Sequence, residues 1–419
     1  MRLPRVDHPG PYLLLLVTCV AGWWFKGHCG AVWTGDEQYI TGCYSDAVPF
    51  WGLRGVAAGQ LPYIEARIEY PVLTGALIWF EGLVVRTIGG ARGDAFDFLL
   101  VVSLVNAALA VAVLRMMERA GLPLARRWCW AAAPPLVLYL GHNWDMLAVA
   151  LAMAAFLAAR RGEAFAGAGL AAIGTAAKLF PVLLLPLLGL GALFRRGATW
   201  HDRLTQAAAL ALTAIVFWGA LNLPIALRAF DNWAEFYTFS SARSGTAASI
   251  WEIMAVQGWW GTDIATRNLW SFLAFAGGAA AIVTVGWRRH GAAPWALFTP
   301  VLAWFLLTNK VYSPQFDLWL YPFLLLTARR LWPIAWFVLG DLAAYWAEFW
   351  FFASPGGGGI GVTQGHIAVA AALRAGAMLW VIVDGILGPK AAWLQSAPDR
   401  GGAVSFAGAH SAASNVSAA

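Results

Sequence analysis

The sequence predicts an all-α polytopic membrane protein, and three observations support this. Hydrophobic residues make up 60% of the 419 residues and charged residues only 12%, whereas about a quarter of a soluble domain is charged. Apolar runs long enough to cross a bilayer recur along the chain. Arginine pairs separate these runs, so the net charge of +6 indicates membrane topology and not a nucleic-acid partner.

The N-terminal stretch "MRLPRVDHPGPYLLLLVTCVAGWWFKG" resembles a signal peptide. It lacks the small-x-small cleavage site of such peptides, and further apolar segments follow it. We therefore interpret it as a retained first span.

Thirteen apolar segments are candidate membrane spans, since roughly 20 apolar residues cross a bilayer and a broken helix needs fewer. They lie near 12–25, 71–88, 96–114, 128–141, 146–160, 164–177, 180–194, 204–221, 269–287, 293–308, 316–328, 331–352 and 364–386.

Four basic pairs fix the orientation, because arginines and lysines concentrate in cytoplasmic loops. Counting spans in both directions from these pairs gives a conflict unless one early segment does not cross. We expect that segment to be 71–88, which follows Pro71 and contains Glu81 and Arg86, and which fits an amphipathic helix in the outer interface. The pairs are Arg160–Arg161, Arg195–Arg196, Arg288–Arg289 and Arg329–Arg330.

The predicted architecture is a membrane domain over 1–388 with about twelve spans and both termini inside. Its large outer loops cover about 26–95 and 222–268, and both are rich in aromatic and acidic residues. Acids in loops are common, but long loops on one membrane face usually carry function. The tail 389–419 is rich in Ala, Ser and Gly and is expected to be a disordered cytoplasmic segment.

Several short motifs in this order resemble a known superfamily. They are "YSDAVPFWGLRGVAAGQLPY", "EYPVLTG", "GHNWD", "AGAGLAAIGTAAKLFPVLLLP" and "NKVYSPQFDLWLYPF". Over roughly 12–386 the chain resembles the GT-C integral-membrane glycosyltransferases. Within them it is most similar to glycosyltransferase family 87, the polyprenyl-phosphate-mannose-dependent α-mannosyltransferases of actinobacteria. It departs from the family where "EYPVL" stands in place of Tyr-Pro-Pro and "GHN" in place of Gly-Gln-x-Asn.

The resemblance implies a large first outer loop with juxtamembrane helices and an acidic residue that acts as the catalytic base. Asp46 is the candidate base, and the alternatives are Asp36 and Glu37 in the same loop. A structural alternative is that Asp46 only helps to cap a helix.

The local sequence favours a helix at Asp46. Ser45 can cap it, Pro49 is tolerated in its first turn, and Gly59 with Pro62 is expected to end it. A carboxylate in the first turn is favoured by the helix dipole, which would keep Asp46 ionised.

The leaving phosphate of such a reaction needs cationic partners. Lys178 and Lys310 each follow an apolar run, at helix breaks marked by Pro181 and Pro314. A lysine at such a place needs an anion unless it extends to the membrane surface. We expect both to bind the donor phosphate, with assistance from Arg54 and His142.

Further polar residues near the same motifs are candidates for substrate binding, although interface anchoring is the commoner role of an aromatic side chain. His142 could alternatively move a proton or be structural. The substrate-binding candidates are Glu69, Tyr70, Asn143, Asp145, Tyr312 and Gln315.

Charged residues within the last two spans are a separate group. Asp341 and Glu348 lie on one helix face and Arg374 lies in the final span. Intramembrane charges are functional candidates, but an ion pair joining the last two helices explains them equally well.

Cysteines and cofactors complete the expectations. Cys29 and Cys43 both fall in the first outer loop, where a disulfide can form, so we expect them to pair. The sequence shows no zinc spacing, Walker motif or dinucleotide fingerprint. A divalent cation is possible, since acidic pairs could hold one.

The expected function is therefore transfer of a sugar, mannose by the resemblance, from a polyprenyl-phosphate donor to an envelope glycolipid or polysaccharide. The active site would face outward from the cytoplasmic (plasma) membrane, and the lipids of this membrane would surround the spans. The alternatives are a transporter or flippase of a lipid-linked sugar and an inactive scaffold. Transporters place polar residues on broken helices near the midplane, in paired repeats. Here they gather near the outer ends of the spans.

Overall fold

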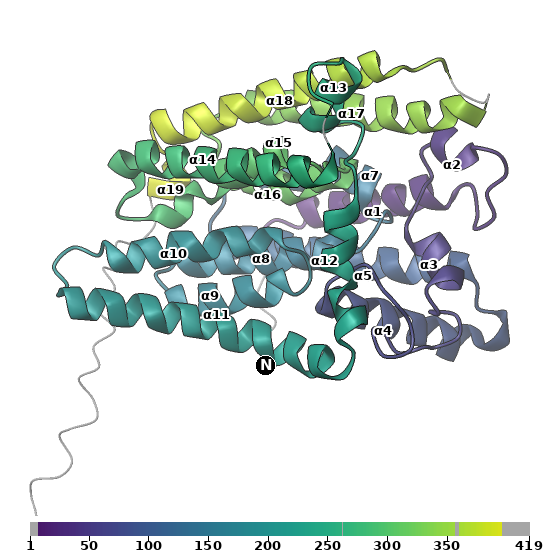
Figure 1. The fold of residues 1–419 in the computed structure, drawn as a ribbon, viewed down its shortest axis with the longest axis horizontal. Helices are drawn as coiled ribbons and strands as arrows, with labels where there is room; N and C mark the ends of the chain where they lie inside the picture. The colour runs from purple at the N-terminus through teal and green to yellow at the C-terminus, as the bar shows by residue number, and fades with distance from the viewer. Residues whose placement is uncertain (1–6, 262, 357–359, 396–419) are drawn as a thin grey trace, which may run out of the picture.

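The computed structural model describes residues 7–261, 263–356 and 360–395, and all regular structure within them is helical (Figure 1). The predicted all-α polytopic class is therefore confirmed. The α-helices are α1 Gly10–Gly27, α2 Glu37–Ile40, α3 Ala47–Leu53, α4 Val72–Gly89, α5 Ala95–Arg119, α6 Leu124–Ala131, α7 Pro134–Tyr139, α8 Asp145–Arg160, α9 Ala164–Thr175, α10 Leu184–Leu193, α11 Trp200–Arg228, α12 Phe230–Ala242, α13 Ile250–Val256, α14 Ile264–His290, α15 Phe298–Thr308, α16 Asp317–Thr327, α17 Trp332–Ala353, α18 Gln364–Leu387 and α19 Ala392–Gln395.

The long helices run side by side in an antiparallel bundle, and α12 crosses them at a steep angle (Figure 1). The short helices α2 and α3 lie at one end of the bundle, while the turn between α10 and α11 lies at the opposite end. We call the first of these the α3 end. It is the end that the basic loops predict to face outward.

By length and composition alone, five segments of the described chain could cross a membrane. They are Val72–Gly89, Ala95–Arg119, Trp200–Arg228, Ile264–His290 and Gln364–Gln395. Other predicted spans are broken. Short 3₁₀ turns at Pro181, Pro294 and Pro314 precede α10, α15 and α16, because proline lacks the N–H that would continue a preceding helix.

Helix α4 begins next to the C-terminal end of α9. The Leu73 N–H donates to the carbonyl of Ala176 at 2.8 Å, just past the last residue of α9. The other end of α4 leads to Asp94, which caps the start of α5 by accepting from two backbone N–H groups. Both ends of α4 therefore lie toward the α3 end, which agrees with a segment that does not cross. Its length and apolar character would also permit a span, so its topology stays a prediction.

The sequence did not indicate which way Glu81 of this helix points. An amphipathic surface helix would direct Glu81 to the headgroups, but Glu81 is fully buried. Its Oε2 accepts a hydrogen bond of 2.6 Å from the Trp144 indole. The polar side chain faces the protein because α4 packs on the first half of α5 and on the turn before α8.

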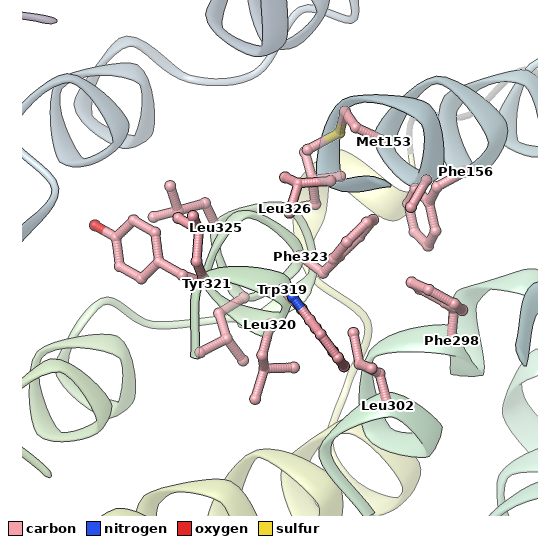
Figure 2. Packing of buried hydrophobic residues seen from close by; sticks show 14 of the residues in the cluster. Met153, Phe156, Phe298, Leu302, Trp319, Leu320, Tyr321, Phe323, Leu325 and Leu326 are labelled. Carbon is pink, nitrogen blue, oxygen red and sulfur yellow. The ribbon is translucent and has the colours of Figure 1, made fainter. Parts of the chain in front are cut away.

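The core of the bundle is aromatic and aliphatic (Figure 2). The rings of Phe323, Phe298 and Phe156 contact one another. The ring centre of Phe323 lies 4.9 Å from that of Phe298 and 5.7 Å from that of Phe156, and the latter two are 6.2 Å apart. Because lipid is as apolar as these side chains, close packing holds such helices together. Helices α17 and α18 approach closely at Gly340, where a Cβ would lie 2.6 Å from the Cα of Arg374.

The buried charges of the last helices pair differently from the expectation. Arg374 of α18 forms an ion pair of 2.8 Å with Asp317 of α16, so it does not join α18 to α17. Asp341 instead accepts from the Tyr139 hydroxyl, and Glu348 accepts from the Ala248 N–H at 3.2 Å. Asp317 was not selected as the partner of Arg374, because it begins an apolar helix three residues after Pro314 and no local sequence pattern joins it to α18.

The segment after Pro389 is partly structured, contrary to the expected boundary of the tail. Helix α19 packs against α16, and Trp393 within it is buried. The Trp393 indole donates to the carbonyl of Ala120 at 2.9 Å. The remainder of the predicted tail, 396–419, lies outside the described residues.

Candidate active site

Asp46 lies at the α3 end, directly before α3, with both carboxylate oxygens bound by tyrosines. Oδ1 accepts from the Tyr44 hydroxyl at 2.9 Å and Oδ2 from the Tyr70 hydroxyl at 2.8 Å. The Asp46 backbone N–H donates to the carbonyl of His142 at 2.8 Å. The first loop is thereby attached to the turn between α7 and α8, and the carboxylate is fixed in orientation.

The helix at Asp46 is shorter than the sequence indicates. Asp46 precedes α3 and its side chain does not cap it. The Ser45 hydroxyl accepts from the Ala47 N–H at 3.2 Å and itself donates to the Gly141 carbonyl at 2.6 Å. Helix α3 ends at Leu53, and Gly55 follows with a φ of +68°, a C-terminal conformation that favours glycine.

Lys178 lies beside the same tyrosine. Its Nζ is 2.9 Å from Asp145 Oδ1 and 4.5 Å from the centre of the Tyr70 ring. Asp145 Oδ2 also accepts from the Trp319 indole at 2.9 Å. Tyr70 therefore contacts a base candidate and a cation: its hydroxyl binds Asp46 and its ring lies next to Lys178.

The protonation of these groups follows from burial and from one another. Burial raises the pKa of Asp46, while the hydrogen bonds from Tyr70 and Tyr44 and the charge of Lys178 lower it. The net direction is upward, so Asp46 is a stronger base than an exposed aspartate, contrary to the simple helix-dipole expectation. The charge of Asp46, together with burial, raises the pKa of Tyr44, so that hydroxyl stays a donor.

His142 and Asn143 occupy the turn that holds Asp46. The His142 ring lies 5.5 Å from the Tyr44 ring and 6.1 Å from the Phe349 ring, centre to centre. Burial and the charges of Lys26 and Lys178 place its pKa well below the usual value, so the imidazole is neutral. Asn143 Oδ1 accepts from the Asp145 N–H at 3.0 Å, which orients the start of α8.

Arg54 and Glu69 form a two-point ion pair at the far end of α3. Arg54 Nε and Nη2 donate to the two carboxylate oxygens of Glu69 at 2.7 and 2.8 Å. The Glu69 carboxylate raises the pKa of Arg54. The predicted helpers of the phosphate and substrate sites are thus bound to each other.

The second half of the chain contributes a separate cluster. Lys310 Nζ donates to the carbonyls of Ser241 and Arg243 at 2.9 and 2.6 Å, and so it satisfies the C-terminal end of α12. The Tyr312 hydroxyl donates to Asp317 Oδ1 at 2.5 Å. Gln315 lies in the 3₁₀ turn between Tyr312 and α16. None of these predicted residues has a hydrogen bond or ion pair to Asp46 or Lys178 within the described chain.

The alternative acids lie on a different helix. Asp36 precedes α2 and Glu37 begins it, and α2 packs on α17. In the part of the chain that the structure describes, no hydrogen bond or ion pair joins either side chain to Asp46 or Lys178. The connection is indirect, through Tyr39, whose ring stacks on Tyr44 at 5.9 Å.

The loop before Asp46 is fixed by a disulfide and a buried lysine. Cys29 and Cys43 are bonded, 14 residues apart in sequence. Lys26 is fully buried, and its Nζ donates to the Gly42 carbonyl at 2.9 Å and to the Tyr345 hydroxyl at 2.6 Å. Both restraints act within four residues of Asp46.

Three contributors to the site were not selected from the sequence: Tyr44, Lys26 and Trp319. Tyr44 stands two residues before Asp46, and its closeness in the sequence could have indicated a contact with that carboxylate. No sequence signal joins Trp319 to Asp145. For a cation, the described residues contain one group of three possible ligands with atoms within 4.8 Å, namely His28, Cys29 and Cys43, and its two sulfurs are bonded to each other.

No family model matches this chain, and no curated protein sequence matches it. Among solved structures it is similar to ArnT from Cupriavidus metallidurans bound to undecaprenyl phosphate. That likeness has 13% identity and a TM-score of 0.42, and it covers 91% of this chain and 78% of that chain. A similarity this loose carries no conclusion about the function of this chain.

Proposed function

We propose that this protein is a polyprenyl-phosphate-dependent glycosyltransferase of the outer face of the cytoplasmic membrane. The observation that supports the proposal is the pair of groups that contact Tyr70: a carboxylate bound by tyrosine hydroxyls and a buried lysine. Mannose as the sugar and an envelope glycolipid or polysaccharide as the acceptor come from the resemblance to family 87.

The reaction requires one base and one anion-binding group. The acceptor oxygen attacks the anomeric carbon of the donor sugar, its proton passes to Asp46, and the bond from that carbon to the phosphate oxygen breaks. The polyprenyl phosphate leaves with the electron pair. One displacement of this kind inverts the configuration at the anomeric carbon and needs no covalent intermediate.

The tyrosines support Asp46 in this role. Each carboxylate oxygen has lone pairs beyond the one used by a tyrosine, so an acceptor hydroxyl can approach without breaking either bond. The fixed orientation reduces the reorganisation needed at the moment of transfer. Asp36 and Glu37 remain the alternative bases.

Lys178 is the candidate partner of the leaving phosphate. Its ammonium is largely buried beside Asp145, in surroundings where charge interactions are stronger than in water. A phosphate oxygen bound there would share the Lys178 ammonium with Asp145 and with the Tyr70 and Phe316 rings, whose centres lie 4.5 and 6.0 Å from Nζ. Lys310 could contribute only if it released the carbonyls at the end of α12.

A transporter or flippase of a lipid-linked sugar is the second candidate. It is favoured by the buried Asp317–Arg374 pair and by Asp341, which lie within the helices. Such groups mark substrate pathways in membrane proteins. Their hydrogen bonds to Tyr312 and Tyr139 serve a fixed structure equally well.

The test is an assay of the full chain in lipid nanodiscs with radiolabelled polyprenyl-phosphate sugars and envelope lipid extracts. A glycosyltransferase yields a labelled acceptor and free polyprenyl phosphate in equal amounts. Movement of intact labelled donor across proteoliposomes, with no transfer, would support the flippase instead. If the protein neither transfers the sugar nor moves the intact donor, the result supports an inactive scaffold.

A further inference from the structure

A polar hollow opens at the far end of α3. It has a volume of about 400 Å³, within the range of small-molecule sites, and its wall includes both members of the Arg54–Glu69 pair. Its lining residues are Leu53, Arg54, Gly55, Gln60, Glu65, Ala66, Arg67, Glu69 and Glu235. We call it the α3 hollow.

Helix α3 connects this hollow to Asp46. The Phe50 N–H donates to the Asp46 carbonyl and the Arg54 N–H to the Phe50 carbonyl, so the three residues lie one turn apart on one face. The Arg54 guanidinium lies over the Phe50 ring, 5.5 Å from its centre. Eight residues of helix span about 12 Å, which is longer than one sugar ring.

A second segment, which contains Glu69 and Tyr70, also connects the hollow to the Asp46 site. Glu69 lines the hollow, and the next residue, Tyr70, donates to Asp46. The residue that lines the hollow and the residue that binds Asp46 are therefore consecutive in one segment. This proximity places the hollow next to the Asp46 site.

Hydrogen bonds and an ion pair within the protein fix the walls of the hollow without a ligand. Tyr63 adopts a left-handed conformation with φ of 67°, and its hydroxyl donates to the Tyr70 carbonyl at 2.9 Å. Asn232 of α12 donates to the Tyr63 carbonyl at 2.6 Å. Glu235, from the same helix, pairs with Arg67, so α12 closes one side of the hollow.

The charges of the lining decide which ligand chemistry fits. Three carboxylates, from Glu65, Glu69 and Glu235, face two guanidinium groups, from Arg54 and Arg67. The excess is negative, which disfavours a phosphate or a carboxylate ligand. Carboxylates and guanidinium groups supply paired acceptors and donors, and the many hydroxyls of a neutral sugar match them.

We propose that the acceptor is a neutral saccharide and that the α3 hollow binds one of its sugar residues, the one distal to the reacting hydroxyl. The proposal rests on the proposed glycosyltransferase function. It adds that the acceptor is an uncharged chain of more than one sugar, with its reacting end at Asp46 and its other end between Arg54 and Glu235. Binding energy obtained in the hollow would then position the reacting hydroxyl.

The experiment compares three acceptors on the full chain in nanodiscs: a methyl mannoside, the neutral methyl mannotrioside, and the same trisaccharide with a terminal phosphate. We expect KM for the neutral trisaccharide to be at least tenfold lower than for the monosaccharide. Glu235→Gln and Glu65→Gln should each remove most of that advantage, since one lost hydrogen bond of about 1.4 kcal/mol is a factor of ten. Glu163→Gln, in an exposed ion pair with Arg161 at the opposite end of the molecule, is the matched control.

Equal KM values for the monosaccharide and the neutral trisaccharide, or a lower KM for the phosphorylated one, would overturn the proposal while leaving the glycosyltransferase function intact. Saturation-transfer NMR with the neutral trisaccharide gives a readout that needs no turnover. Contacts that disappear in Glu235→Gln but persist in Glu163→Gln support the hollow as a saccharide site even if no sugar is transferred.

Discussion

Two clusters of this protein use the same parts in different surroundings. Around Asp46, tyrosine hydroxyls bind a carboxylate on a loop at the α3 end, and Asp46 itself is only partly buried. Around Arg374, the Tyr312 hydroxyl binds Asp317 within the helices, where Asp317 and Arg374 are 0% and 1% exposed. We call these the Asp46 cluster and the Arg374 cluster.

The comparison separates groups available for chemistry from groups that hold helices together. In the Arg374 cluster the cation has a carboxylate at 2.8 Å and an aromatic ring 3.8 Å away, and the surrounding helices enclose it. In the Asp46 cluster the carboxylate retains free lone pairs and the chain around it is loop. Substitutions in the Asp46 cluster are therefore expected to affect activity, and substitutions in the Arg374 cluster are expected to affect stability.

The largest expected effect is at the proposed base, Asp46. Asp46→Asn keeps the shape of the side chain but cannot accept the proton, and a positioned base contributes typically 10²–10⁴-fold in rate. We expect transfer to fall by about that factor while the unfolding temperature stays close to that of the unaltered protein. Asp36→Asn is the matched comparison. Near-normal turnover of Asp46→Asn, with loss in Asp36→Asn or Glu37→Gln, would move the base to α2.

Breaking the Arg374 cluster should act on stability. Arg374→Met leaves Asp317 buried and unpaired, which costs about 3–5 kcal/mol, so thermal unfolding in detergent should occur at a clearly lower temperature. Adding Asp317→Leu should restore most of the loss, because an apolar pair can replace a buried ion pair. Arg54→Met, which breaks the more exposed pair with Glu69, should cost about 1 kcal/mol or less.

A substrate pathway through the Arg374 cluster would give a different pattern. The double variant would then regain stability but lose activity. Recovery of both stability and transfer assigns the cluster a structural role.

The disulfide should matter more to the Asp46 cluster than to the Arg374 cluster. Closing a loop of about 15 residues contributes roughly 3 kcal/mol, and Cys43 lies three residues before Asp46. We expect Cys43→Ser to lower the unfolding temperature and to speed hydrogen exchange in 29–46, with little change in α16 and α18. Cys129→Ser, at an unpaired cysteine, is the control. Two free thiols at Cys29 and Cys43 by mass spectrometry without reductant would contradict the pairing.

The smallest expected effect is a displacement of the pH profile. The proposed base, Asp46, accepts a proton only when it is ionised, and burial raises its pKa. We therefore expect the rate to fall with decreasing pH sooner than it would with an exposed aspartate. The Tyr44 hydrogen bond lowers that pKa. Tyr44→Phe should therefore move the acidic limb of the profile to higher pH, whereas Tyr39→Phe should not. An unchanged limb in Tyr44→Phe would indicate that Asp46 does not control the rate.

The sequence by itself determined the class of the protein and the positions of its helices. Apolar runs, proline breaks and arginine pairs are local signals, and they located the long helices along the chain. Helices α5, α11 and α14 nevertheless extend beyond the predicted spans 96–114, 204–221 and 269–287. The resemblance to GT-C glycosyltransferases selected Asp46 as the candidate base, whereas Tyr70, Asp145 and Lys178 were selected because they stand in polar motifs next to apolar runs.

The tertiary structure alone decided which candidates meet. Lys178 and Lys310 have the same local pattern, yet one lies against Tyr70 and Asp145 and the other against the end of α12. Residues more than a hundred positions apart are joined by how α5, α8, α9 and α16 pack, and packing depends on side-chain shape over many residues at once. The Trp319–Asp145 bond, the buried Glu81 and the Asp317 partner of Arg374 had no local signal for that reason.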